Sequence, residues 1–299
     1  KKRYLFFLGH PAHYHLFKNI ISRLDSNGND VKVLIKSKDI LEQLCKNSNL
    51  DYVNILPVRR KNNYWSYFVS FIIKYYKISK IIRSFKPNLL LSSEPAFSHL
   101  GKIFNIPSFI FSEDDADIIP LYAFITYPFT DYIISPKVCN AGKWEYKKIG
   151  YDGYHKMCYL HPEVFIPNKK LISEKLGDKY FIIRFADLNA YHDNNKNGID
   201  TETAKQIIDL LKPHGRVYIT SENELSLDLE KYRIKINPDL IHHALFYSEL
   251  YIGDSQSMAV EAAILGTPGI RFNDFVGKIS VLNELENKYG LTIGINSND

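Results

Sequence analysis

Three histidines stand within six residues near the start of the chain, in the segment Gly-His-Pro-Ala-His-Tyr-His of residues 9–15. They follow an apolar run at residues 4–8, which predicts a buried strand. Because imidazole changes its charge near neutral pH, a histidine just beyond a strand end is suited to proton transfer. We interpret His13 as a candidate general base and His10 as a candidate substrate contact. A metal site would need convergent acidic or cysteine ligands, and none is adjacent.

A second polar turn follows the apolar strand predicted at residues 250–252 and leads into an alanine-rich helix. Its polar residues are Asp254, Ser255, Gln256 and Ser257. Free backbone N–H groups and the dipole at a helix N-terminus favour an anion, and the phosphate of a nucleotide is the usual one. Glu261 lies one turn further on, within reach of a ribose hydroxyl. An ordinary N-cap would explain the same residues, and no GxGxxG or P-loop motif indicates a dehydrogenase or a P-loop kinase.

Polar residues also follow or end the other strands predicted in the second half, at residues 179–185, 216–220 and 269–272. The candidates for ligand contacts in these places, and on the helix before residue 250, are Arg184, Asn189, His192, Asp193, Glu222, His242 and Arg271. Arg184 or Arg271 would stabilise a leaving diphosphate, a task that a metal ion performs in other enzymes. Solvated loops, and a packed or capping His242, are the alternatives.

Carboxylates end two strands that are predicted in the first half. Glu94 follows the strand at residues 88–91, and Glu113 and Asp114 follow the strand at residues 108–111. Two neighbouring carboxyl groups can divide the roles of acid and base between them. Glu113 and Asp114 are therefore candidate catalytic residues, with solvated helix caps as the alternative.

Strand and helix signals alternate along the chain, which predicts parallel sheets covered by helices on both faces. Residues 135–167 show little periodicity and separate two such halves. We predict an α/β protein of two Rossmann-like domains, residues 1–150 and 151–299, with parallel sheets that face an interdomain cleft. In open parallel sheets ligands sit beyond the carboxyl ends of the strands, which is where the polar loops fall.

The composition excludes several classes of protein. The chain has 299 residues, of which 45% are hydrophobic, so disorder is excluded. A net charge of +5 is too mild to predict nucleic acid as a partner. Its three cysteines form no CxxC pair, so we expect no disulfide framework, no zinc site and a cytoplasmic location. No signal peptide is recognisable, and no apolar run reaches the roughly 20 residues of a membrane span.

A long helix is predicted at residues 64–85, and it combines aromatic with basic side chains. Basic residues at 59–61 precede it. A helix packed on the core with a basic outer face would account for this pattern. The alternative is a peripheral contact with an anionic membrane, through residues 64–85, on the inner face of the cytoplasmic membrane.

The two polar turns, with their surroundings, resemble a known family. Residues 8–19 look like the opening of a bacterial and archaeal family of unknown function that is found among surface-polysaccharide genes. Residues 251–258, 265–268 and 271–278, the last ending at Lys278, look like its second signature. That family is similar to the non-hydrolysing UDP-N-acetylglucosamine 2-epimerases and to glycosyltransferases of the GT-B fold.

The resemblance implies a GT-B-like fold and a nucleotide sugar as ligand. It places Ser255, Gln256, Ser257 and Glu261 at the diphosphate and the ribose, in agreement with the helix N-terminus argument. The epimerases carry an arginine and a lysine in their first turn, where this chain has Pro11 and Leu16. Their acidic residue is shifted here as well, to Glu113 or Asp114. Because epimerisation needs acid and base groups to eliminate and re-add the nucleotide, this loss speaks against it.

Our leading hypothesis is a metal-independent glycosyltransferase of cell-surface polysaccharide synthesis. It would move a sugar from a nucleotide-sugar donor, with UDP as the expected nucleotide, to a glycan or a lipid-linked acceptor. The second domain would hold the donor and the first domain the acceptor. No cofactor or metal is expected, because no DxD-like pair clearly follows a strand. A nucleotide-sugar epimerase and a non-enzymatic nucleotide-sugar or glycan-binding protein are the alternatives.

Overall fold

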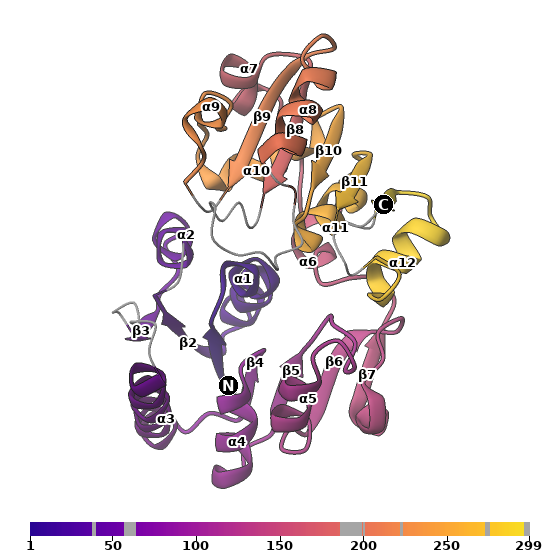
Figure 1. Ribbon diagram of the computed structural model, residues 1–299. Coiled ribbons are helices and arrows are strands. Elements are labelled where there is room, and N and C mark those ends of the chain that lie inside the picture. Colours follow the sequence, from indigo (N-terminus) through magenta and orange to yellow (C-terminus); the bar gives the residue numbers. More distant parts are fainter. Residues whose placement is uncertain are drawn as a thin grey trace. The chain divides into compact units, whose positions relative to one another are not determined.

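The structure is a computed structural model that describes residues 1–37, 40–56, 64–185, 199, 201–221, 224–272 and 276–295, with the backbone alone at residues 64–68. Contacts within the chain divide it into two units, Lys1–Tyr159 and Leu160–Asp299. In each unit helices pack on a parallel sheet (Figure 1).

Unit 1 is built on a seven-stranded sheet in the order β3-β2-β1-β4-β5-β6-β7, in which neighbouring strands are parallel. The strands are β1 (Arg3–Leu8), β2 (Asp30–Lys36), β3 (Val53–Leu56), β4 (Leu89–Ser92), β5 (Ser108–Phe111), β6 (Tyr132–Pro136) and β7 (Lys148–Tyr151). Parallel strands are covered on both faces and so read as continuous apolar runs. This explains β1, whose last four side chains are fully buried.

Helices cover both faces of this sheet, because successive side chains of a strand point to opposite sides. Phe6 and Leu8 pack among residues of α1 and α2, whereas Leu5 and Phe7 pack against α3 and α4. The helices of unit 1 are α1 (Pro11–Ser26), α2 (Leu41–Asn47), α3 (Tyr64–Phe85), α4 (Pro95–Phe104), α5 (Pro120–Thr126) and the 3₁₀ helix η1 (Gly142–Lys147). The short helix α6 (Met157–Leu160) lies where the two units meet in sequence.

Unit 2 has a five-stranded sheet in the order β12-β11-β10-β8-β9, and its neighbouring strands are also parallel. The strands are β8 (Tyr180–Phe185), β9 (Arg216–Ser221), β10 (Leu250–Gly253), β11 (Gly269–Phe272) and β12 (Thr292–Ile295). The helices are α7 (Lys170–Leu176), α8 (Thr201–Leu211), α9 (Leu227–Glu230), η2 (Pro238–Leu240), α10 (Ile241–Phe246), α11 (Gln256–Leu265) and α12 (Ser280–Asn287).

The two strand orders determine where each unit can bind a ligand. In unit 1 the chain winds away from β1 first towards β2 and then, through β4, in the other direction. In unit 2 the same reversal occurs between β8 and β10. At such a switch point the connections leave the carboxyl ends of two adjacent strands on opposite sides, and this opening is the usual binding position of the fold class.

The alternating strands and helices that the sequence predicts are confirmed, and both sheets are parallel. The edge strands β7 and β12 were not predicted. Both are short and contain a glycine, and Ile149 and Ile293 on them remain exposed, so neither has a buried apolar run that marks a strand. The sequence placed the division of the chain after residue 150, whereas the contacts place it after Tyr159, because β7 pairs with β6.

Among the described residues, no helix is both long and apolar enough to cross a bilayer.

Candidate functional site

The histidine turn of unit 1 lies directly beyond β1, at the switch point. His10 is the N-cap of α1, with extended backbone angles, and its Nδ1 accepts a hydrogen bond from Ala12 N–H at 3.2 Å. Pro11 occupies the first helical turn, where its lack of an N–H costs nothing. The next histidine in the turn, His13, points back towards the strand end, and its Nδ1 accepts from Gly9 N–H at 3.1 Å. The local sequence therefore fixes both imidazoles.

The hydrogen bond from Gly9 decides what His13 can do. Burial lowers the pKa of His13 to about 3; Glu94 opposes this shift, while His10, Lys36 and His155 add to it. The imidazole is thus neutral near pH 7, and its Nδ1 is an acceptor. A neutral imidazole carries one proton, so that proton is on Nε2. In this state His13 is suited to donate a hydrogen bond from Nε2 rather than to take up a proton.

Glu94 is the centre of a buried charge cluster at the same strand ends. It precedes α4 without capping it, and its carboxylate turns instead to Lys36 of β2 at 2.7 Å and to Lys74 of α3 at 3.0 Å. Burial raises the pKa of this carboxyl, but Lys74 and Lys36 outweigh burial and hold the pKa at about 2. Gly9 makes the arrangement possible, since a Cβ there would lie 2.3 Å from Glu94 Oε1.

The carboxylates after β5 differ sharply in their surroundings. Glu113 contacts the ammonium group of Lys156 and accepts a 2.6 Å hydrogen bond from His155 N–H. Burial raises its pKa, but Lys156 and His155 outweigh burial and leave the pKa below the ordinary value. Asp114 is exposed, yet partial burial of its carboxyl, with Glu113 and Asp115 nearby, raises its pKa against the effect of Lys156. Asp114 is the carboxyl group that is better suited to accept a proton.

His155 and Lys156 bring a loop after the edge strand β7 into this site. The His155 ring stacks on Tyr151 with 6.1 Å between centroids, and its buried Nε2 has no hydrogen-bond partner among the described residues. Burial lowers the pKa of His155 to about 4, although Glu113 opposes the shift. The ring of Phe111 contacts both His155 and Phe17 of α1, so this loop lies near the helix that begins at the histidine turn.

In unit 2 the polar turn lies beyond β10, at the second switch point. Ser255 is the N-cap of α11, and its hydroxyl accepts from Met258 N–H at 3.4 Å. The turn is fastened to the neighbouring strand, since Asp254 N–H donates to the carbonyl of Arg184 at 3.2 Å. Gly253 permits this approach, because a Cβ there would lie 2.5 Å from the same carbonyl. Ser257 is exposed in the first turn of α11.

The side chain of Arg184 lies along the carboxyl ends of β8 and β9. Its Nη1 donates to Thr220 Oγ1 at 3.0 Å, and Arg184 and Thr220 face each other in the strand register. The backbone of Arg184 contacts the Ser255 turn, as described above, so its cationic side chain and the N-terminus of α11 belong to the same edge of the sheet.

His242 and Glu261 are brought together, although 19 positions separate them. His242 Nε2 lies 3.2 Å from Glu261 Oε1, and only 9% and 13% of the two side chains are exposed. The ring of Phe165 contacts His242 edge-on. This pair ties α10 to α11, one turn from the Ser255 turn. The predicted contact of Glu261 with a ribose stays a prediction, and it would have to coexist with this pairing.

Arg271 pairs with Gly253 in the strand register, but its side chain is directed to α12. The Arg271 side chain is fully buried and pairs with Glu286 of α12, so its guanidinium offers no surface to a diphosphate. Lys278 is exposed before α12. Asn189, His192, Asp193 and Glu222 lie outside the described residues.

Four groups of this site were not predicted from the sequence: Lys36, Lys74, His155 and Lys156. Lys36 ends an apolar strand, so the strand-end rule that found Glu94 would have found it too. Lys74 is inside a helix and has no local signal. His155 and Lys156 lie in a stretch that was interpreted as a connection between the domains. Within the described part of the chain, no group of three or more His, Cys, Asp or Glu residues is placed to hold a metal ion.

The sequence profile of a family described as "Protein of unknown function (DUF354)" matches residues 7–275. The chain belongs to the DUF354 family. No curated protein matches the sequence. The family that the sequence resembled in its two polar turns is thus confirmed, and the matched residues include both turns.

Solved structures show what the DUF354 chain is similar to in fold. The UDP-GlcNAc 2-epimerase from Methanocaldococcus jannaschii has a TM-score of 0.71 and 14% identity, over 99% of this chain and 89% of that one. The UDP-GlcNAc 2-epimerase from Neisseria meningitidis bound to UDP-GlcNAc has a TM-score of 0.69 and 15% identity, over 99% and 87%. The glycotransferase of kitacinnamycin has a TM-score of 0.58 and 9% identity, over 99% of this chain and 87% of that one. These likenesses confirm the predicted GT-B-like fold class of two parallel-sheet α/β domains.

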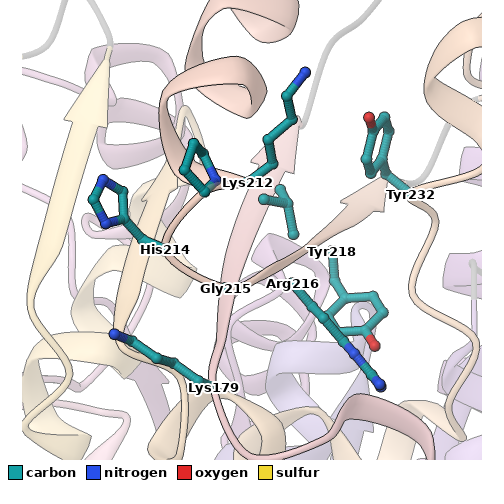
Figure 2. A pocket seen from close by; sticks show the side chains of 9 residues that line it. Lys179, Lys212, His214, Gly215, Arg216, Tyr218 and Tyr232 are labelled. Carbon is teal, nitrogen blue, oxygen red and sulfur yellow. The ribbon is translucent and has the colours of Figure 1, made fainter.

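A hollow elsewhere on unit 2 of the DUF354 chain is a weaker candidate for a ligand site than the carboxyl ends of the strands. It is lined by basic and tyrosine side chains around the amino ends of β8 and β9, among them Lys179, Lys212, His214, Arg216 and Tyr232. Figure 2 shows that its cationic groups point in different directions rather than towards one point. Converging donors are what a ligand site requires, so the chemistry is better sought at the carboxyl ends.

The charge cluster around Glu94 makes the stability of the DUF354 chain depend on pH. Glu94 has a folded pKa of about 2 against an ordinary 4.5, so its stabilisation is complete above pH 4.5 and is lost as pH falls towards 2. We expect Glu94→Gln to lower the free energy of unfolding by about 3 kcal/mol at pH 7, because two buried lysines lose their counter-charge. The loss should shrink at pH 3. Urea unfolding at the two pH values measures both.

Asp152→Asn is the matched control, because Asp152 pairs with Lys137 at the surface, with 85% of its side chain exposed. Exposed ion pairs contribute little to stability, so this variant should unfold like the parent protein at both pH values. An equal loss for Glu94→Gln at pH 7 and pH 3 would contradict the assignment of the low pKa to Glu94.

Proposed function

We propose that the DUF354 chain is a nucleotide-sugar-dependent glycosyltransferase that moves a sugar from a UDP-linked donor to a glycan or lipid-linked acceptor in the synthesis of a cell-surface polysaccharide. The observation that carries the proposal is the N-terminus of α11, capped by Ser255 and placed at the switch point of unit 2. Solved structures with this fold include two described as epimerases in complex with UDP-GlcNAc.

Unit 2 would hold the diphosphate of the donor. The free backbone N–H groups at the start of α11 and the exposed Ser257 hydroxyl supply donors for phosphate oxygens. Arg184 at the end of β8 would neutralise the charge that develops on the leaving diphosphate. This arrangement does the work of a metal ion with groups of the chain itself, which is why we propose metal independence.

Unit 1 would supply the proton acceptor. The acceptor hydroxyl attacks the anomeric carbon, the bond from that carbon to the phosphate oxygen breaks, and the nucleoside diphosphate leaves. The hydroxyl proton passes to a base. We assign this role to Asp114, because it is an exposed residue whose carboxyl has a raised pKa, whereas Glu113 is held by Lys156 and His13 is a hydrogen-bond donor. A carboxylate of raised pKa accepts a proton more readily than an ordinary one.

Nucleotide-sugar epimerisation is the second candidate, because epimerases are among the structures with a similar fold. The epimerase from M. jannaschii has a TM-score of 0.71, against 0.58 for the glycotransferase. Proton NMR of the protein with UDP-, GDP-, CMP- and dTDP-sugars, without an acceptor, separates the two. Slow release of free sugar and nucleotide supports transfer to water. A new anomeric signal that is still bonded to nucleotide would establish epimerisation instead.

The phosphate role of the Ser255 turn is tested by Ser255→Ala. We expect the Kd for UDP to rise about tenfold, because the cap that orders the first turn of α11 is lost. Isothermal titration calorimetry measures the affinity. Ser226→Ala is the control, since Ser226 precedes the short helix α9 and makes no side-chain cap bond there. Equal affinities in both variants and the parent would exclude this turn as the nucleotide site.

The role of Asp114 is tested by Asp114→Asn, which removes the proton acceptor and keeps the shape. We expect kcat to fall by about 10²-fold or more, with the affinity for UDP unchanged. Asp117→Asn is the matched control, because Asp117 is exposed three positions further along the same loop. The measurement is the initial rate of nucleotide release from the donor found by NMR. An unchanged kcat in Asp114→Asn would show that Asp114 is not the base.

A membrane contact through residues 64–85 is part of the proposal, in line with a lipid-linked acceptor. On α3, Ile78 and Ile82 are buried in the core, while Phe71, Ile72 and Tyr76 leave 50%, 50% and 66% of their area exposed. An exposed aromatic and aliphatic face beside lysines is typical of interfacial helices. We expect the protein to sediment with vesicles that contain anionic lipid and Ile72→Glu to sediment less. Equal sedimentation of both proteins would remove α3 as the contact.

A further inference from the structure

The cluster of Lys36, Lys74 and Glu94 contains more positive than negative charge. The two ammonium groups come from different elements, the end of β2 and the middle of α3, and both contact the one carboxylate. The exposed fractions of the three side chains are 18%, 13% and 12%. Within the described residues of this contact, one positive charge therefore remains uncompensated in a largely buried place.

A buried excess charge is unfavourable, since the charge has lost much of its hydration without gaining a full counter-charge. One lysine would be enough to neutralise Glu94 and to join two elements of the fold. The second lysine adds a desolvation cost that the ion pair alone does not require. None of the three side chains is completely buried.

A neutral donor lies next to this charge. His13 lies beside Glu94, because Gly9 N–H donates to His13 Nδ1 at 3.1 Å and a Cβ at Gly9 would lie 2.3 Å from Glu94 Oε1. Its proton is therefore on Nε2, for which no described residue is a hydrogen-bond partner. Two ammonium groups and an imidazole N–H are the donor set that an oxyanion takes, because each lends a charge-assisted or neutral hydrogen bond to one oxygen.

We propose that Lys36, Lys74 and His13 form an oxyanion subsite in unit 1, which takes a carboxylate or phosphate group on the part of the substrate that is not the nucleotide. The subsite deepens the proposed function, on which its place in catalysis rests. It assigns an acidic substrate to the enzyme: an acceptor or a transferred sugar that carries a carboxylate, or a phosphate-linked acceptor. Glu94 holds the two lysines in position and lowers the net charge to a single positive one.

The test observes the subsite directly and uses no nucleotide sugar. The full-length protein is labelled with ¹⁵N-histidine, and the His13 signal is assigned by its loss in His13→Gln. Inorganic phosphate and glucuronate are titrated separately against chloride of equal ionic strength. We expect the His13 signal to show the Nε2-protonated tautomer and to shift saturably with at least one of the two anions. No shift of this signal with either anion would overturn the proposal.

Two lysine variants show whether the charge causes the binding. Lys74→Met should raise the Kd for the anion that binds by about tenfold, because one of two charge-assisted contacts is lost. Lys80→Met is the matched control, since Lys80 is exposed on the same helix, and it should bind like the parent. If Lys74→Met unfolds, Lys74→Arg keeps the charge and should bind within about threefold of the parent. Equal affinity in Lys74→Met and the parent would overturn the proposal.

Ser255→Ala separates this subsite from the nucleotide site. The variant should leave the anion-dependent shift of His13 unchanged, because Ser255 belongs to unit 2. A protein that shows the His13 shift but binds no nucleotide would refute the proposed function and leave the subsite standing. The response to phosphate compared with that to glucuronate tells which acidic group the subsite prefers.

Discussion

In both units the winding of the parallel sheet reverses between two adjacent strands, and the rest of the molecule depends on this reversal. It leaves the carboxyl ends of β1 and β4, and of β8 and β10, without a covering crossover. The loops that leave these ends must then satisfy their own polar groups. Glycine permits close contacts there, since a Cβ at Gly9 would lie 2.3 Å from the Glu94 carboxylate and a Cβ at Gly253 would lie 2.5 Å from the Arg184 carbonyl.

The two openings have different electrostatic character, in keeping with different tasks. The opening of unit 2 offers backbone N–H groups, a serine cap and Arg184, a set that suits a phosphate. The opening of unit 1 is a network of buried acids and bases: Glu94 is held ionised by two lysines, Glu113 is held ionised by Lys156, and His13 and His155 are held neutral by burial. Groups with such divergent pKa values at one strand edge are typical of functional sites.

The fold comparison and the site geometry support different parts of the functional argument. Structures at 14% and 15% identity establish the GT-B-like fold and nothing about the reaction of the DUF354 chain. The reaction has to be argued from the residues at the switch points. At the switch point of unit 1, the hydrogen bond from Gly9 turns His13 from the expected base into a donor. After the next strand, β5, Asp114 is an exposed residue whose carboxyl has a raised pKa.

The sequence by itself determined the fold class, the family and the location of both polar turns, because buried parallel strands, helix caps and the residues between them are local patterns. It singled out His13, Glu113, Asp114 and the Ser255 turn as candidates for the same reason. Only the tertiary structure decided their protonation and partners. Lys36 and Lys74 meet Glu94 from 58 and 20 positions away, and Lys156 meets Glu113 from 43. Burial and charge contacts across such separations set the pKa values, and no local pattern in the chain encodes them.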